Sequence, residues 1–265
     1  MSEHFAIEGN ERGSSNTRLP VFADFAQGRF NRDELAHVSR YLLVAEHLIA
    51  RARRQRRGLK VLDIGCGEVP LARIFNRSFF VRKTDVIAQY VGLDIDYKSL
   101  SRAEENKPPS FPIELISGDV TGGALTQFRD RQFDVVVCME VIEHLEPEFV
   151  RPLLSEICRV GHWACISTPV GSGKLPADHV KEWGYTELLA ELARAGLEVE
   201  REIGIFCRIP DFQRAAKGDP RLEGLYHFLR QKMDSNFLSV TLARFAPRAA
   251  QNVLRFCRCG PLEGC

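Results

Sequence analysis

The chain is organised by a repeated alternation of short apolar runs with stretches of helical pattern. The runs are continuously apolar and rich in β-branched residues, which is typical of strands covered by helices on both faces. They comprise residues 60–65, 90–95, 113–118, 133–139 and 163–168. The stretches between them carry apolar residues at helical spacing and supply the crossovers. This alternation predicts an α/β fold with a doubly wound, mostly parallel sheet.

The segments on either side of this alternation predict additions to the sheet. Residues 31–57 show helical spacing, which predicts an N-terminal helix capped by Asn31. The apolar positions of this helix are Leu35, Val38, Tyr41, Leu42, Ala45, Leu48 and Ile49. Beyond the fifth run we expect a helix over 185–196, a strand over 197–206, a helical insertion over about 210–247 and a last strand over 252–259. The insertion either covers the binding crevice as a lid or serves packing alone.

Length and composition bound the domain organisation. The 265 residues suffice for one sizeable core, and residues 1–30 are polar and aperiodic. We therefore expect a disordered or extended segment over 1–30, followed by a single domain over 31–265. The sequence has no secretory leader pattern and no apolar stretch of about 20 residues, which predicts a cytoplasmic protein without a membrane span. The eight cysteines are expected to be reduced thiols rather than disulfides or metal ligands.

The overall charge does not favour a polyanionic partner. The chain has 36 basic and 35 acidic residues, for a formal net charge of +1. Nucleic acid is therefore possible as a partner but is not favoured. The arginines within 51–57 are interpreted as the solvated end of the N-terminal helix, where positive charge suits the helix dipole.

A glycine-rich turn follows the first apolar run, in the order strand, turn, helix. In the segment DIGCGEVP, Gly65 and Gly67 allow the backbone to approach a ligand closely, and Pro70 suits the first turn of a helix. The dinucleotide fingerprint G-x-G-x-x-G needs a third glycine where this chain has Pro70. The turn therefore predicts a nucleotide-like ligand other than NAD.

Acidic residues stand at the ends of the next two runs. Asp94 ends the second run, 29 residues after Gly65, where doubly wound folds bind ribose hydroxyls with a carboxylate. Asp119 follows the third run and offers an acceptor for an exocyclic amine such as that of adenine. Because the carboxyl ends of parallel strands meet at one edge of the sheet, we expect these acids and the glycine turn to share one site.

The series VLDIGCG, VGLDID, GDV and FDVVVCMEVIEHL resembles the class I S-adenosylmethionine-dependent methyltransferases, in particular their ubiquinone-biosynthesis-like branch with its E-V-[IL]-E-H segment. The resemblance covers about residues 60–199 and implies a seven-stranded, Rossmann-like sheet whose seventh strand, residues 252–259, is antiparallel. It implies S-adenosylmethionine as cofactor, with the methionine end at the glycine turn, the ribose at Asp94, adenine at Asp119, and further contacts after the fourth strand. The residues carried over for cofactor binding are Asp63, Gly65, Cys66, Gly67, Asp94, Ile95, Asp119, Val120, Met139 and Glu140. In one departure from the family, Val69 replaces the usual third glycine of the first motif.

The resemblance implies methyl transfer, for which the enzyme must align the acceptor and remove its proton. His144 and His179 are the candidate catalytic bases, because an imidazole titrates near neutrality. No residue is assigned as a metal ligand, and we expect activity without a metal. The methyl acceptor is unidentified, and a small molecule, sugar or lipid-like metabolite is expected.

Two alternatives remain open. In the first, Glu140, Glu143, His144 and His179 bind a divalent metal, as in the HEN1-like small-RNA 3′-end 2′-O-methyltransferases that the segments EVIEH and DHVKEW resemble. In the second, the chain is a non-catalytic methyltransferase-like module that binds the cofactor or a partner without transferring a methyl group. Cofactor binding measured separately from methyl transfer distinguishes the second alternative from an enzyme.

Overall fold

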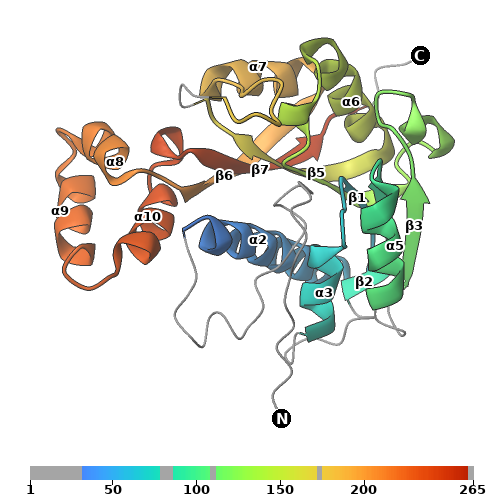
Figure 1. The fold of residues 1–265 in the computed structure, drawn as a ribbon, viewed down its shortest axis with the longest axis horizontal. Coiled ribbons are helices and arrows are strands. Elements are labelled where there is room, and N and C mark those ends of the chain that lie inside the picture. The colour runs from blue at the N-terminus through green and yellow to red at the C-terminus, as the bar shows by residue number, and fades with distance from the viewer. Residues whose placement is uncertain (1–31, 78–85, 108–111, 172–174, 262–265) are drawn as a thin grey trace.

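One seven-stranded sheet organises the computed structural model, which describes residues 32–77, 86–107, 112–171 and 175–261 (Figure 1). Its strands are β1 (Leu59–Ile64), β2 (Ile87–Asp94), β3 (Ile113–Ser117), β4 (Phe133–Met139), β5 (Gly161–Pro169), β6 (Leu197–Phe206) and β7 (Asn252–Cys259). They lie in the order β3-β2-β1-β4-β5-β7-β6. Strands β1 to β5 pair in parallel, and β7 pairs antiparallel with both β5 and β6. The predicted doubly wound, mostly parallel sheet is therefore confirmed, as is its antiparallel last strand.

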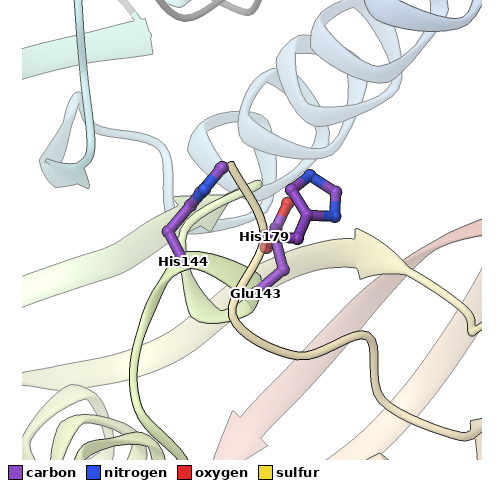
Figure 2. Close-up of side chains that lie close together, drawn as sticks. All are labelled: Glu143, His144 and His179. Carbon is purple, nitrogen blue, oxygen red and sulfur yellow. The ribbon is translucent and has the colours of Figure 1, made fainter. Parts of the chain in front are cut away.

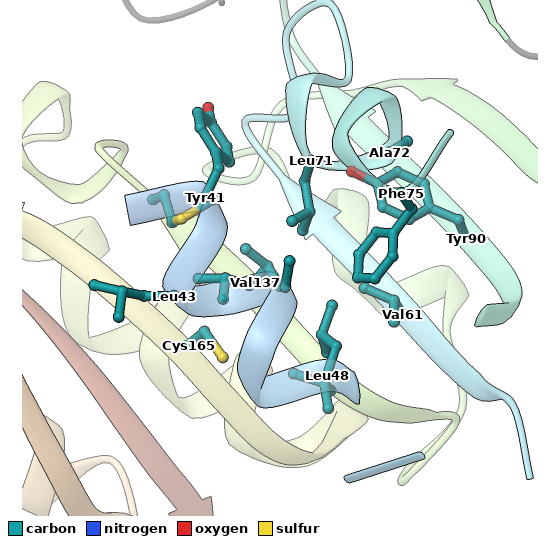
Figure 3. Close-up of a cluster of buried hydrophobic side chains, with 14 of the residues drawn as sticks. Tyr41, Leu43, Leu48, Val61, Leu71, Ala72, Phe75, Tyr90, Val137 and Cys165 are labelled. Carbon is teal, nitrogen blue, oxygen red and sulfur yellow. The ribbon is translucent and has the colours of Figure 1, made fainter. Parts of the chain in front are cut away.

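Helices cover both faces of this sheet (Figure 1). One face carries α2 (Arg32–Gln55), α3 (Pro70–Arg77) and α5 (Tyr97–Asn106), and the other carries α6 (Pro147–Val160), α7 (Tyr185–Arg194) and the 3₁₀ helix η2 (Ala124–Gln127). Figure 3 shows the cluster on the first face, where side chains of α2 and α3 meet those of β1, β4 and β5. Full burial of one such side chain stabilises a fold by about 1.5–3 kcal/mol. The two clusters therefore hold the strands, and with them the loops at the strand ends, in fixed positions.

The N-terminal helix is present as α2, and its buried face matches the predicted one in part: Tyr41, Ala45 and Leu48 are buried as expected, whereas Leu42 is not. Leu42 was expected in the core and is 52% exposed, whereas Val44 is completely buried. Arg40 is buried as well. The segment YLLVA is apolar around most of the helix circumference, so spacing alone does not select the face that packs on the sheet. The expectations for residues 1–30 and for the Asn31 cap lie outside the described residues.

The helical insertion between β6 and β7 is also present. It consists of α8 (Ile209–Ala216), α9 (Pro220–Leu229), α10 (Ser235–Ala243) and the 3₁₀ helix η4 (Pro247–Ala249). In Figure 1, α8 and α9 project away from the sheet, whereas α10 packs against α2 and β6. At its end the Gln251 N–H donates to the Phe206 carbonyl at 2.8 Å, so the chain enters β7 beside the end of β6. Within the described ranges, no helix is both long and apolar enough to cross a membrane.

Candidate active site

A cavity of about 830 Å³ lies at the carboxyl ends of the parallel strands, where the strand order reverses between β1 and β4. Its walls are the loops that follow β1, β2, β3 and β4, with further residues from α2 and from the segment after β5. Doubly wound sheets bind their ligands at this topological switch point. No described residue of the α8–α10 insertion is among those that line the cavity.

The glycine turn after β1 forms one wall through its backbone. The Gly65 and Cys66 N–H groups donate to the Leu93 carbonyl of β2, at 2.8 and 3.2 Å. Gly65 has a φ of 67°, and a Cβ added there would lie 2.4 Å from the Val141 side chain. Val69, at the departure from the family motif, has a φ of 51°, which a β-branched residue rarely adopts. The family's glycine at this position therefore corresponds to a real left-handed turn, which Val69 maintains here with its side chain buried.

Asp94 connects the second strand end to this turn. One carboxylate oxygen accepts from the Gly67 N–H at 2.7 Å, and the other accepts from the Asp96 N–H at 2.8 Å. Each carboxylate oxygen can accept a second hydrogen bond. Asp94 is half-buried and lines the cavity. It can therefore bind a ligand hydroxyl while it holds the glycine turn in shape.

Asp63 lies beneath the cavity rather than in its wall. Its carboxyl is buried and accepts a hydrogen bond from the Tyr90 hydroxyl. Burial raises the pKa of Asp63 to about 7, with a further contribution from the nearby Asp94 charge, although the Tyr90 hydrogen bond opposes the shift. A change in Asp63 ionisation near neutral pH therefore alters the charge directly under the glycine turn.

The third strand end and an exposed apolar side chain complete this half of the cavity. Asp119 accepts hydrogen bonds from the Thr121 hydroxyl and N–H, both at 2.8 Å, and these bonds hold the Asp119 pKa below its usual value. Ile95 lines the cavity and is 69% exposed. An exposed apolar side chain beside an acceptor suits a flat heterocycle that carries an amino group.

At the other half of the cavity, Glu140 begins the loop after β4. Its carboxylate accepts from the Ser167 hydroxyl at 2.8 Å and from the Asn252 amide at 2.6 Å, and it forms an ion pair with Arg40 at 3.3 Å. The Arg40 Nε and Nη1 atoms are buried and have no hydrogen-bond partner among the described residues. Arg40 is next to Tyr41, which lines the cavity, and in Figure 3 the Tyr41 hydroxyl points away from the core cluster. Arg40 itself is not among the lining residues, so it acts on the cavity through its ion pair with Glu140.

A cluster of one carboxyl and two imidazoles lies next to this loop (Figure 2). Glu143 and His144 belong to the 3₁₀ helix η3 (Ile142–His144), and His179 comes from the segment after β5. The three side chains each offer an N or O atom within 4.8 Å of the others. The Glu143 carbonyl accepts from the Val180 and Lys181 N–H groups, which brings His179 over η3. The fold thus brings together three side chains from two distant segments, and each of them could bind a metal ion or carry a proton.

The electrostatics of this cluster differ among its members. Glu143 is completely buried, and burial together with the Glu140 charge raises its pKa well above the usual value. Within the described part of the chain its Oε1 has no hydrogen-bond partner, whereas Oε2 accepts from the Thr168 hydroxyl at 3.2 Å. The His144 Nδ1 lies 2.7 Å from the Asp178 carbonyl oxygen, and the His179 Nδ1 lies 3.4 Å from Glu182. Since a carbonyl only accepts, the His144 Nδ1 carries a proton and its Nε2 is the free basic nitrogen.

The structure brings most of the residues singled out in the sequence to one cavity. Those that line it are Gly65, Cys66, Asp94, Ile95, Asp119, Val120, Met139, Glu140 and His144. Asp63, Gly67 and His179 are adjacent but do not line it. Sequence reasoning missed Arg40, Tyr41 and Asp178. An arginine inside the apolar stripe of the N-terminal helix was the one signal that could have indicated the first of these.

Comparison with known proteins gives a consistent family. The model of the methyltransferase domain family matches residues 62–162. The ubiquinone biosynthesis O-methyltransferase of Thiobacillus denitrificans is 31% identical over 172 residues, and the match covers 56% of this chain and 68% of that protein. The small RNA 2′-O-methyltransferase of Xenopus tropicalis is 32% identical over 152 residues, and the match covers 48% of this chain and 38% of that protein. The chain spans about half the length of the curated relatives that it matches, for instance 44% and 56% of two of them.

Solved structures agree at the level of the fold. A complex between the Haloferax volcanii Trm112 methyltransferase activator and a methyltransferase matches 92% of this chain and 96% of the solved one, with a TM-score of 0.54 and 18% identity. The [4+2]-cyclase SpnF matches 82% of this chain and 80% of its own, with a TM-score of 0.53 and 16% identity. The same sheet architecture thus occurs in proteins named for different reactions, so the chemistry must be argued from the site.

Proposed function

Because the chain belongs to the class I S-adenosylmethionine-dependent methyltransferases, we propose that it transfers the methyl group of S-adenosylmethionine to an acceptor positioned beside His144. The observation that carries this proposal is the cavity at the carboxyl ends of β1 to β4. It joins the glycine turn, Asp94, Asp119 and His144 in one space of about 830 Å³. A small metabolite, sugar or lipid-like molecule is the class of acceptor we expect.

The residues present fit the cofactor. Asp94 would accept the ribose hydroxyl protons, Asp119 would accept from the adenine amine, and Ile95 would contact the adenine ring. Gly65 lines the cavity, and its lack of a side chain lets Val141 pack against the turn that would contact the methionine portion. Arg40 does not line the cavity, but its ion pair with Glu140 would hold that carboxylate at the methionine end. This set of residues supports cofactor binding in one orientation, with the methionine end toward Glu140.

The side chains beside the expected acceptor position, His144 and His179, would orient the acceptor and carry its proton. When bound, S-adenosylmethionine supplies a methyl group activated by its sulfonium. His144 would take the proton of the acceptor nucleophile on Nε2, while the Asp178 carbonyl holds the ring orientation through Nδ1. His179 packs edge-on against His144, with ring centroids 5.0 Å apart, and would orient it. Holding the two reactants in line can lower the barrier by about 7–11 kcal/mol, so alignment contributes more than the base.

Transfer of a tritiated methyl group tests the proposal. The protein is incubated with methyl-labelled S-adenosylmethionine and fractionated cell extract, and the labelled fraction is classified as small molecule, lipid, protein or nucleic acid. We expect label in a small-molecule or lipid fraction, and none with an Asp94→Ala protein. Binding of S-adenosylhomocysteine without transfer to any fraction would instead support a non-catalytic module.

A second candidate function rests on the cluster of Glu143, His144 and His179. One carboxylate and two imidazoles form a donor set suited to Mn²⁺, Co²⁺ or Zn²⁺, and the Asp178 carbonyl on His144 resembles the outer hydrogen bonds that orient metal-binding histidines. A metal there would hold an acceptor hydroxyl. The similarity to a small RNA 2′-O-methyltransferase makes the terminal ribose of an RNA the matching acceptor.

Chelation separates the two functions. With His144 as a base, activity survives prolonged dialysis against EDTA. With a metal at the cluster, the same treatment abolishes activity and Mn²⁺ restores it, and an RNA 3′ end becomes labelled in the transfer assay. We retain metal independence as our expectation, because Glu140 lies outside the cluster, bound to Asn252 and Arg40.

A further inference from the structure

Glu140 has a backbone conformation that its surroundings must enforce. It has a φ of 55°, in the left-handed region that is unfavourable for residues other than glycine, and its N–H donates to the Ser167 carbonyl at 3.0 Å. Such a conformation persists where neighbouring groups determine it, and it is common at functional sites. The direction of the Glu140 side chain therefore depends on the groups that bind it.

These groups come from three separate elements. Ser167 of β5 donates to Oε1, and Asn252 of β7 and Arg40 of α2 both bind Oε2. Asn252 is 2% exposed, and its position is fixed because it pairs with Pro169 of β5 and Phe206 of β6 at the start of β7. Its amide is thus a rigid donor aimed at the same oxygen that faces Arg40.

Asn252 is absent from the family motifs and lies far along the chain from the glycine turn, yet it determines how Glu140 meets Arg40. We propose that Asn252 is a positioning residue for the methionine end of the cofactor site: together with Ser167 and Arg40 it fixes the direction of the Glu140 carboxylate, which lines the cavity. The inference rests on the proposed function. This role also explains why the side chains of the EVIEH segment lie in two places: Glu143 and His144 lie with His179, whereas Glu140 does not.

Titration of S-adenosylhomocysteine into full-length variants tests this role. We expect Asn252→Ala to weaken binding roughly tenfold, because a hydrogen bond to a charged group is lost and Glu140 is free to turn away from Arg40. The matched control is Gln251→Ala, which changes the preceding residue, whose side-chain oxygen has no hydrogen-bond partner. This control should bind within about twofold of the wild type. Thermal midpoints by circular dichroism verify that each variant is folded.

An exchange of charge distinguishes positioning from a structural role. Asn252→Asp alone should bind more weakly than Asn252→Ala, because two carboxylates then face each other. Adding Glu140→Gln to Asn252→Asp restores one donor and one carboxylate and should recover most of the affinity. A double variant as weak as Asn252→Asp, or an Asn252→Ala protein that binds like the control, would overturn the inference. A wild-type protein that does not bind at all would contradict the proposed function itself and the inference with it.

Discussion

The two halves of the cavity are built in different ways. The half that follows β1, β2 and β3 consists of turns and single acids, each directly after its strand, so that backbone groups and neighbouring residues form the walls. The half beside Glu140 consists of side chains that converge from α2, η3, β7 and the segment after β5. The first half is thus local in sequence and matches the family, whereas the second depends on tertiary packing. We infer that the first half, called the cofactor half, binds the nucleoside end of the cofactor, and that the second half holds the methionine end together with the acceptor.

The largest effect is expected from a change at His144, which should alter turnover without altering cofactor affinity. His144→Ala should lower turnover on the order of 10²–10⁴-fold, which is the contribution of a general base, while the affinity for S-adenosylhomocysteine stays near that of the wild type. Single-turnover transfer and equilibrium titration measure the two quantities. A loss of cofactor affinity equal to the loss of rate would assign His144 to the cofactor half instead.

The buried acid under the glycine turn predicts a pH-dependent stability. The folded pKa of Asp63 is raised from 3.8 to about 7, so the folded state binds the proton more tightly than the unfolded state. Its contribution to stability is fully present below about pH 4 and is lost as pH rises through about 7. At about 1.4 kcal/mol per pKa unit, the total change is about 4 kcal/mol.

Urea unfolding at a series of pH values checks this. Relative to Asp63→Asn, the wild type should lose unfolding free energy between about pH 4 and pH 8. The difference between the two proteins is the quantity compared, because the raised pKa of Glu143 acts in the same direction and the lowered pKa of the buried His47 acts in the opposite one. If the unfolding free energy depended on pH equally in the two proteins, Asp63 would ionise normally and its surroundings would be hydrated.

Gly65→Val tests the backbone wall of the cofactor half. The added side chain would meet Val141 and would have to adopt a φ of 67°, so we expect S-adenosylhomocysteine affinity to fall by about 3 kcal/mol, more than a hundredfold. Gly224→Val is the matched control, because nothing lies within 4 Å of a Cβ at that helical position. Equal binding by the two variants would show that the turn is not a ligand wall.

Asp94→Ala is expected to have the smallest of these effects. Loss of the carboxylate removes the acceptor of the ribose hydroxyls and should weaken cofactor binding by about 1–3 kcal/mol. The Gly67 and Asp96 N–H groups lose the same acceptor, so a moderate fall in the thermal midpoint should accompany the change. Asp94→Asn retains an acceptor oxygen and should lose less. Normal cofactor binding by a folded Asp94→Ala protein would mean that a different carboxylate binds the ribose.

Sequence patterns predicted the sheet and the local half of the cavity because both depend on short-range rules. Continuous apolar runs indicated the parallel strands, and Gly65, Asp94 and Asp119 each directly follow or end a strand. The other half could not be predicted in the same way. Leu42 and Val44 are both apolar in one helix, and packing decides that Val44 is buried. Arg40 and Asn252 meet Glu140 only because α2 and β7 pack beside the end of β4.

The most direct test of the account is isothermal titration of the wild-type chain with S-adenosylhomocysteine and, separately, with NAD. The turn from Gly65 to Pro70 lacks the third glycine of the dinucleotide fingerprint, while the cavity holds acceptors for both ribose and adenine. We predict saturable binding of S-adenosylhomocysteine with one site per chain and no measurable binding of NAD. Comparable binding of NAD, or no binding of S-adenosylhomocysteine, would contradict the assignment of this cavity as a methyltransferase cofactor site.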